Sequence, residues 1–369
     1  MSHRQLPTVL FVATPAALGG SNRSLITLLK SLEGEVERVL ASPSFGSFKE
    51  LVDQEGLADE YVQLPRKPNH RIDRALRLLG GVKLAWWTLR NRRRLKAIHA
   101  NALTGLNLAA LAAMITQRPT VVWIHDPVGS PWGRRLGPLL RRMLPKLRFA
   151  AVSPTAEAVA VDNGLCQSGD ATIIPNPIDP EEIVAAVARR DEEPITIGIL
   201  GGASHRKGFD LMPEVIDGLA DLPVTWMLYV HLQPNRGNQT VWDELDRFPR
   251  SLVDPVGKTS NVREAYATLD IVFCPSRAES FCRVAAEAMM NGIPVVGSDI
   301  DPLKALLGDD DAGLIFPSED VSAAIAALRA LVEDRDLRKS LGQVGLIRAK
   351  RFAPEAIARD LTDLYGITS

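Results

Sequence analysis

Short apolar segments alternate with helical segments along the chain, and this alternation restricts the fold more than any other feature. Runs such as TVLFVAT (8–14) and VTWMLYV (224–230) have the length and β-branched content of buried strands. Segments such as RSLITLLKSL (23–32) repeat apolar residues at helical spacing. Strands that alternate with helices predict βαβ units, and therefore parallel sheets covered by helices.

The alternation occurs in two series. Further strands of the first series are expected at 38–43, 97–102, 120–126, 148–154 and 171–179. A charged stretch at 185–194 is interpreted as a linker. The second series has expected strands at 195–201, 269–276, 293–299 and 312–317, and expected helices at 208–220, 322–334 and 355–365. Because 369 residues exceed one ordinary core, we expect two doubly wound α/β domains, 1–180 and 181–350, followed by a C-terminal helix in 351–369.

Composition indicates an ordinary globular protein, with 46% hydrophobic and 24% charged residues. No run reaches the ~18 apolar residues of a membrane span, and the chain start enters a strand instead of resembling a signal peptide. The three cysteines, Cys166, Cys274 and Cys282, have no metal spacing and fit a reducing compartment. We therefore expect a cytoplasmic protein. The DDD segment (309–311) is interpreted as a solvated turn, and no metal is assigned.

Ligands of such sheets bind at the carboxyl ends of the strands. In GILGGASHRKGFD (198–210), a strand leads into a Gly-rich turn and then into Arg206 and Lys207. Backbone amides, a helix start and two cations favour a diphosphate. A tight turn with solvated cations explains the same residues equally well.

Two other strand ends are candidates. Gly19 and Gly20 stand between a strand and a helix, where they form either a flexible turn or a place for a ligand to approach the backbone. His125 follows the strand at 120–126 and is either a structural residue or a substrate contact.

The segment ESFCRVAAE (279–287) has a carboxylate at each end. We expect a helix from Ser280 as N-cap, so that Glu279 and Glu287 lie about 12 Å apart. One hypothesis places sugar hydroxyls at Glu279, phosphates at the helix start and a ribose at Glu287. The alternative is a surface Glu279 and a Glu287 paired within the core, because an unpaired buried carboxylate is costly.

The stretch PSRAESFCRVAAEAMMNGIPVV (275–296) resembles the nucleotide-sugar signature of family 4 retaining glycosyltransferases, with its Glu-x7-Glu spacing. IIPNPID (173–179), HRKGFDLM (205–212) and RFAPEAIARDL (351–361) match the same family in the expected order. The resemblance implies the GT-B arrangement, in which two Rossmann-like domains face each other across a cleft. The second domain would bind the donor and the first the acceptor.

The resemblance also implies roles. Arg206 and Lys207 would hold the diphosphate, Glu279 the donor sugar and Glu287 the ribose, while His125 would contact the transferred sugar near the reacting carbon. Loop residues complete the donor site implied by the resemblance: Gly19, Gly20, Gly202, Ser280, Phe281 and Cys282. No cofactor or metal would be needed, because cations and helix amides would stabilise the leaving group.

Three positions depart from the family pattern. One is near Lys304, where the family often has a glutamate after the next strand. Gly202 stands where the family commonly has an Arg, five residues before the Lys, and Arg206 is the candidate substitute. Cys282 stands where the signature has a small Gly after its Phe. These departures keep open a catalytically weak protein that binds sugar nucleotides.

Two segments suggest the surroundings of the acceptor. Residues 71–96 carry nine Lys+Arg and one Asp, and residues 133–148 carry six Lys+Arg and no acid. Apolar residues are interleaved with these cations, and the pair Trp86-Trp87 suits a membrane interface. We expect a peripheral enzyme on an anionic inner membrane face with a lipid-linked acceptor. Amphipathic helices that pack their apolar side would give the same pattern. A nucleic-acid partner could also use these basic segments, but no other feature of the sequence favours such a partner.

The sequence therefore predicts a retaining glycosyltransferase of the hexosyltransferase type. It would move a sugar from a nucleotide-diphosphate sugar to a glycan or lipid-linked acceptor in cell-envelope or polysaccharide synthesis. A nucleotide-sugar epimerase or hydrolase on the same scaffold is the alternative enzyme.

Overall fold

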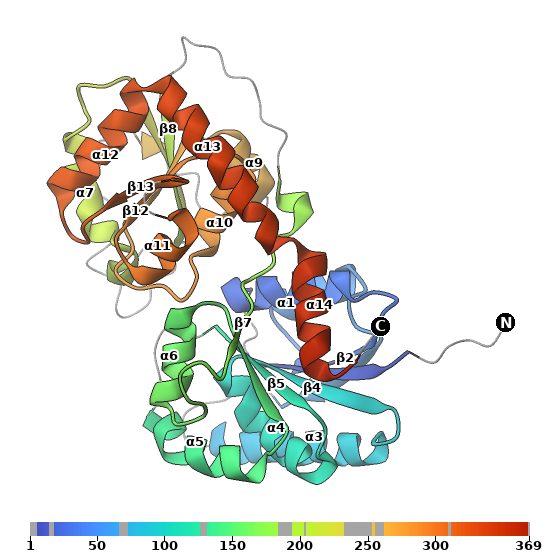
Figure 1. The fold of residues 1–369 in the computed structure, drawn as a ribbon. Helices are drawn as coiled ribbons and strands as arrows, with labels where there is room; N and C mark the ends of the chain where they lie inside the picture. Colours follow the sequence, from blue (N-terminus) through green and yellow to red (C-terminus); the bar gives the residue numbers. More distant parts are fainter. Residues whose placement is uncertain are drawn as a thin grey trace. The chain divides into compact units, whose positions relative to one another are not determined.

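The computed structural model describes residues 6–14, 18–65, 73–125, 131–183, 194–202, 204–231, 253–254, 262–308 and 311–367. The chain divides into two compact units (Figure 1). The first comprises residues 1–177 and 354–369, and the second residues 178–353. All of the expected linker at 185–194 except Pro194 lies outside the described residues.

The first unit contains a parallel sheet in the order β3-β2-β1-β4-β5-β6-β7. Its strands are β1 (Thr8–Ala13), β2 (Glu37–Pro43), β3 (Glu60–Leu64), β4 (Leu95–Asn101), β5 (Thr120–Ile124), β6 (Leu147–Ala151) and β7 (Thr172–Ile173). β1 is fully buried and pairs with β2 and β4, so the strand order reverses at the centre of the sheet. The strand expected at 171–179 is only two residues long, because Pro175 and Pro177 have no N–H to donate to a ladder.

Helices cover both faces of this sheet. They are α1 (Gly20–Ser31), α2 (Ser47–Gln54), α3 (Asp73–Arg90), α4 (Leu103–Thr116), α5 (Pro131–Met143), α6 (Pro154–Asp162) and α14 (Pro354–Tyr365). α1 and α14 lie on one face, and α3, α4 and α5 on the other (Figure 1). A Cβ on Gly105 would lie 2.8 Å from the carbonyl oxygen of Val12, so glycine allows α4 to approach β1 closely. In the part of the chain that the structure describes, no helix combines the length and apolar character needed to cross a membrane.

The second unit contains a parallel sheet in the order β10-β9-β8-β11-β12-β13. Its strands are β8 (Ile195–Gly202), β9 (Val224–His231), β10 (Val253–Asp254), β11 (Ile271–Cys274), β12 (Val295–Ser298) and β13 (Gly313–Phe316). Its helices are η1 (Pro180–Glu182), η2 (His205–Lys207), η3 (Phe209–Leu211), α7 (Met212–Asp217), α9 (Val262–Ala267), α10 (Arg283–Met290), α11 (Asp301–Leu307), α12 (Val321–Glu333), α13 (Arg335–Ala349) and η4 (Lys350–Phe352). Two parallel sheets, each connected by helices, confirm the predicted α/β class.

One expected helix is shorter than predicted. The segment 208–220 begins with the 3₁₀ turn η3, and α7 covers only Met212–Asp217. Pro213 lies in the first turn of α7, as predicted, because its missing N–H is unpaired there anyway.

A buried polar contact joins α14 to the first sheet. The hydroxyl of Tyr365 lies 2.8 Å from Nδ1 of His99, and both residues are almost fully buried. The rings of Phe11 and Trp123 pack against the imidazole, with centroids 5.3 and 5.8 Å away. Burial lowers the pKa of His99 to about 3, although a contact with Asn101 acts in the opposite direction. The imidazole is therefore neutral in the folded unit.

Acid should weaken the first unit through His99. The folded pKa lies below the unfolded value of about 6.5, so the unfolded chain binds the proton first. The contribution of neutral His99 to the unfolding free energy is fully present above about pH 6.5. It falls at about 1.4 kcal/mol per pH unit as the pH drops toward 3. Urea unfolding of the first unit between pH 7 and 5 should show this dependence of unfolding free energy on pH. His99→Gln should make the dependence less steep by the amount that corresponds to one bound proton. Equal slopes for His99→Gln and wild type would contradict this account.

Candidate active site

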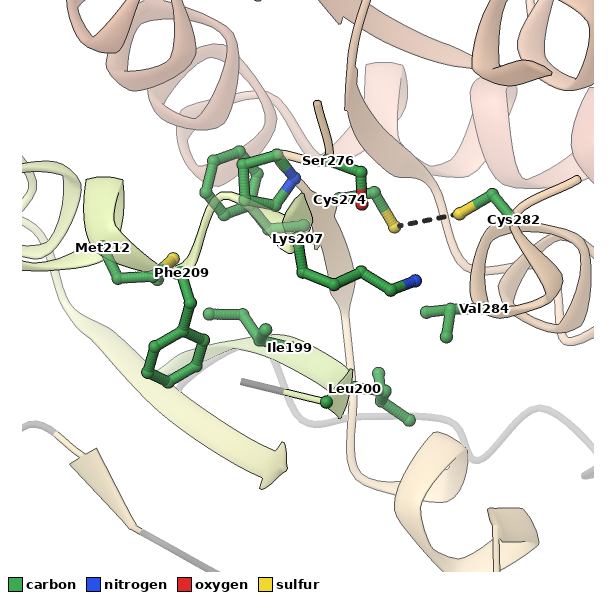
Figure 2. A pocket seen from close by; sticks show the side chains of 12 residues that line it. Ile199, Leu200, Lys207, Phe209, Met212, Cys274, Ser276, Cys282 and Val284 are labelled. Atoms are coloured by element: carbon green, nitrogen blue, oxygen red, sulfur yellow. Dashed lines mark hydrogen bonds between the residues drawn. The ribbon is translucent and has the colours of Figure 1, made fainter. Parts of the chain in front are cut away.

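The second sheet has a ligand-binding geometry at its centre. The strand order changes direction between β8 and β11, so their carboxyl ends are adjacent and the following segments diverge, as at the ligand sites of open α/β sheets. A pocket of about 20 Å³ lies at this point, with room for about one water molecule (Figure 2). Its polar and thiol side chains are those of Lys207, Cys274, Ser276 and Cys282. The stem of Lys207 extends across the pocket toward Val284 and Cys282 (Figure 2).

Gly208 lets the two strand-end segments meet backbone to backbone. Its φ is +69°, in the left-handed region, and a Cβ there would lie 1.9 Å from the carbonyl oxygen of Pro275. Next to it, the backbone N–H of Arg277 donates to the carbonyl oxygen of Arg206 at 2.8 Å. A side chain at position 208 would push the cation-bearing segment away from β11.

Arg277 holds the same two segments together through its side chain. Nη1 donates to Oδ1 of Asp210 at 2.7 Å and to the carbonyl oxygen of His205 at 2.6 Å, and Nη2 donates to Oδ2 of Asp210 at 2.8 Å. Nε donates to Glu319 at 2.7 Å. Burial acts to raise the pKa of Asp210, but the hydrogen bonds and charge of Arg277 hold that pKa below its usual value. Sequence reasoning missed Arg277 and Asp210: their opposite charges were visible in the sequence, but the adjacency of the two strand ends was not.

Three predicted site residues come together on this support. Nζ of Lys207 donates to Oε1 of Glu279, and the hydroxyl of Ser276 donates to the same oxygen at 3.0 Å. Nη1 of Arg206 lies 3.3 Å from Oε2 of Glu279 and donates to the carbonyl oxygen of Ala278 at 2.6 Å. Two cations share one carboxylate, so the cluster has a net positive charge and can attract an anion.

The charge of Lys207 persists at neutral pH. Burial alone would lower the pKa of its ammonium group, but the charge and hydrogen bond of Glu279 raise that pKa above the ordinary value. Glu279 is itself buried, at 8% exposure, so each group compensates the other. The lysine therefore offers a fixed cation at the carboxyl end of the sheet.

Glu287 is paired inside the second unit. Its Oε2 accepts from the hydroxyl of Tyr266 at 2.8 Å, and its Oε1 accepts from Nε of Arg283 at 2.8 Å. The sequence left two hypotheses for Glu287, a ribose contact or a carboxylate paired within the core. The observed contacts agree with the second. The ribose contact stays a prediction for Glu287, since carboxylate oxygens can accept further hydrogen bonds.

The predicted helix start at Ser280 is wrong. α10 begins at Arg283, and its N-cap is Cys282, with φ +66° and no side-chain cap bond. Residues 280 and 281 form a bend, and the left-handed residue then turns the chain into the helix. The 12 Å estimate between Glu279 and Glu287 assumed helix throughout, so it fails for the part before Arg283.

The remaining loop residues of the second unit differ in exposure. A Cβ on Gly202 would meet nothing within 4 Å, so the end of β8 is open on that side. Ser280 is half-buried, whereas Phe281 is buried with its ring edge against Phe352, at a centroid distance of 5.4 Å. Phe281 therefore packs in the interior of the unit, and Gly202 and Ser280 remain accessible.

Three predicted residues belong to the first unit. Gly19 is the N-cap of α1 and Gly20 its first residue, and a Cβ on Gly19 would meet nothing within 4 Å. His125 follows β5 and is buried at 8% exposure, with its ring 4.5 Å from that of Trp123. Asp126, the next residue, lies outside the described ones.

No metal centre is seen in the described part of the chain. No cluster of three or more His, Cys, Asp or Glu side chains there could hold a metal ion. Asp309 and Asp310 of the DDD segment are outside the described residues. Independence from metal stays a prediction.

Two doubly wound parallel units, one with cations and a carboxylate at its strand-order reversal, define a glycosyltransferase of the GT-B class. Residues 18–182 match the family model "Glycosyltransferase Family 4", and residues 180–346 match "Glycosyl transferases group 1". The chain belongs to this glycosyltransferase family, and the predicted family and enzyme class are confirmed.

Individual relatives agree with this assignment. The chain is 28% identical to the lipopolysaccharide core biosynthesis mannosyltransferase LpsB of Rhizobium meliloti (strain 1021), over 76% of this chain and 78% of that protein. It is 27% identical to the phosphatidyl-myo-inositol mannosyltransferase of Mycobacterium tuberculosis (strain ATCC 25618 / H37Rv), over 73% of this chain and 72% of that protein. The crystal structure of Anabaena Alr3699/HepE with UDP and glucose has the same fold, with a TM-score of 0.79, 20% identity and coverage of 97% and 98%.

Removing the Arg277 side chain should loosen the second unit. Arg277→Ala leaves the carboxylate of Asp210 and the carbonyl oxygen of His205 without their donors. The expected loss is about 1–2 kcal/mol of unfolding free energy, after allowance for partial exposure. Urea unfolding of the second unit measures it.

Arg329 provides the matched control. It forms the same two-pronged contact with Asp221, at 2.7 and 2.8 Å, but on the surface. Arg329→Ala should therefore cost clearly less than Arg277→Ala. Equal losses in the two variants would show that Arg277 does not hold the two segments together.

Proposed function

We propose that the chain is a retaining glycosyltransferase that transfers a hexose-type sugar from a nucleotide-diphosphate sugar to a glycan or lipid-linked acceptor of the cell envelope. The observation that carries this proposal is the cluster of Arg206, Lys207 and Glu279 at the strand-order reversal of the second sheet. Its net positive charge lies where ligands of such sheets bind.

The cluster suits a departing diphosphate. When the bond from sugar to diphosphate breaks, negative charge grows on the phosphate oxygens while the sugar becomes oxocarbenium-like. Lys207 supplies a fixed charge, and the half-exposed Arg206 can place its guanidinium on phosphate oxygens in two-pronged fashion. In this proposal these cations do the work of a metal ion, so neither metal nor cofactor is required.

Other residues would surround the donor. Glu279 would accept hydroxyls of the donor sugar and Glu287 those of the ribose, each with lone pairs that its present partners leave available. The open positions Gly19 and Gly202, and the exposed Gly20, would let ligand atoms approach the backbone. His125 would contact the transferred sugar.

Retention is part of this proposal because the family resemblance implies it, and the carboxylates of the second unit bear on how it would occur. Among the described residues that line the small pocket, none is a carboxylate, and nearby Glu279 is held by two cations. A carboxylate so neutralised is a weak nucleophile. We therefore infer attack by the acceptor from the same face as the departing diphosphate, in place of a covalent intermediate.

The relatives support the donor and acceptor classes. Two of them are named as mannosyltransferases, one in lipopolysaccharide core biosynthesis and one acting on phosphatidyl-myo-inositol. A protein of the same fold binds UDP and glucose. In this proposal the donor is a nucleotide sugar, the acceptor is an envelope glycan or lipid, and the reaction takes place on the cytoplasmic side of the membrane.

Loss of a cation should slow the transfer. Lys207→Ala removes a charge that faces the developing negative charge, and we expect kcat to fall about 100-fold or more. Arg206→Ala should act in the same direction but less strongly, because its side chain is more exposed. Release of nucleotide from the sugar donor, with and without acceptor, measures the rate.

Lys339→Ala is the control, since it removes an exposed lysine of α13. Full activity of Lys207→Ala would overturn the diphosphate role. Nucleotide release by the wild type that no acceptor accelerates would indicate a hydrolase instead.

Glu287 should determine nucleotide affinity. A thermal-shift panel of UDP-, GDP-, ADP- and dTDP-sugars without added metal identifies the donor, because saturating ligand at 100 times Kd adds about 2.7 kcal/mol. Glu287→Gln should weaken binding of the nucleotide sugar that the panel identifies by about 1–3 kcal/mol.

The comparison variant is Tyr266→Phe, which removes a partner of Glu287 but keeps the carboxylate. It should lower the melting temperature of the free protein while the ligand-induced shift persists. If both variants keep the full shift, Glu287 does not hold the ribose.

A further inference from the structure

An exposed apolar surface extends along α3. Leu78, Leu79, Val82, Trp86 and Leu89 are between 50% and 71% exposed. Their spacing places them on one side of the helix, opposite the buried Leu84 and Trp87. The outer side of a surface helix is normally polar, so this side is unusual for a face in water.

α4 continues this surface. A Cβ on Gly80 would lie 3.4 Å from the side chain of Leu108, so glycine lets α3 and α4 pack closely. α4 exposes Leu111 and Ile115 beside α3. The two helices lie next to each other on the sheet face opposite α14 (Figure 1). The α3–α4 face is defined by Leu78, Leu79, Val82, Trp86, Leu89, Leu111 and Ile115.

The structure corrects the expected use of the tryptophan pair. Trp86 is exposed, and the guanidinium of Arg90 lies over its ring at 5.0 Å. Trp87 is buried, and its Nε1 donates to Glu60 at 2.6 Å. Only the first of the two can reach an interface, and α4, which the sequence reasoning did not include, supplies further apolar contacts.

The segment that contains α3 and α4 has almost no acids of its own, although Arg94 pairs with Glu37 and Glu60 from other segments. Between residues 74 and 156 there are fifteen Lys and Arg, and Asp126 is the one acid. The strongly one-sided charge would attract an anionic surface at about 1 kcal/mol per cation near it.

A pocket of about 250 Å³ lies at one end of the α3–α4 face. Its lining combines the apolar Leu89 and Ile115 with Thr116 and the three arginines Arg92, Arg93 and Arg118. Nη2 of Arg118 donates to the carbonyl oxygen of Arg92 at 2.8 Å, which fixes the turn. Within the described residues, Arg92 and Arg93 form no ion pair. The dipole at the end of a helix favours cations nearby, which is an alternative reason for these arginines. It does not explain why they lie beside an exposed apolar face.

We propose that the α3–α4 face docks on a bilayer of anionic phospholipid, with a lipid phosphate in the pocket of Arg92, Arg93 and Arg118. The apolar side chains would enter the boundary between head groups and acyl chains, where Trp86 is favoured. Nucleic acid fits less well, because the six exposed aliphatic side chains of α3 and α4 would gain nothing from it. The proposal adds a membrane surface to the proposed transferase, and it rests on the surface alone and not on the identity of the donor.

The test is sedimentation with vesicles of phosphatidylcholine, with and without phosphatidylglycerol, in the absence of any sugar nucleotide. Wild type should pellet with the anionic vesicles at low salt and be released by salt. Arg92→Glu with Arg93→Glu should lower the partition coefficient at least about 30-fold. Trp86→Ala should also weaken binding, although it changes no charge.

Lys339→Glu with Lys350→Glu is the control, with the same charge change at exposed residues of the other unit. It should bind as wild type does. All variants should keep the thermal shift given by the sugar nucleotide, which separates failure of this proposal from failure of the proposed function.

A second readout locates the contact. Lipids brominated on their acyl chains should quench part of the tryptophan fluorescence of the wild type, and Trp86→Phe should remove that part. No pelleting at low salt overturns the proposal, as does equal loss of binding in the control. Binding to DNA or RNA fragments without binding to anionic vesicles would assign the arginines to nucleic acid instead.

Discussion

The ion pair between Arg277 and Asp210 joins the segment after β8 to the segment after β11, and the charged groups of the site keep their positions through it. Neither segment has regular hydrogen bonding of its own beyond short 3₁₀ turns. The side-chain bonds of Arg277 and the backbone contact at Gly208 replace that missing order. Held in this way, Lys207 meets Glu279 without loss of loop entropy on ligand binding.

The two cations then differ in what they can do. Lys207 is largely buried and bound to Glu279, so its charge is fixed in place, and in the proposed reaction it would need no rearrangement to meet a diphosphate. Arg206 is half-exposed and more loosely bound to the same carboxylate. Because its side chain is 46% exposed, it has room to turn toward solvent. In the proposed reaction, a fixed cation and an adjustable one would let a single cluster accept donors of slightly different shape.

The sequence allowed the fold class to be predicted because strand and helix periods are local properties, visible in runs such as 8–14 and 224–230. It also indicated Arg206, Lys207 and Glu279, because each follows a strand end. The pairing of Arg277 with Asp210 was missed, because contacts between strand ends depend on sheet order, which spacing does not fix. The start of α10 was misplaced, because Ser280 is a good N-cap by composition while the backbone turns two residues later. Trp87 was wrongly grouped with Trp86, because adjacent residues of a helix point in different directions.

Cys282 explains why the family signature has a glycine at this place. Its φ of +66° lies in the left-handed region, where a non-glycine residue costs about 1–3 kcal/mol. The surroundings must therefore impose this conformation: α10 follows at once, and the buried sulfur lies 4.0 Å from that of Cys274 in the pocket wall. Burial of the thiol offsets part of the backbone cost. The loop therefore makes its left-handed turn with a cysteine where the family signature has a glycine, and the cost of this departure is in backbone free energy.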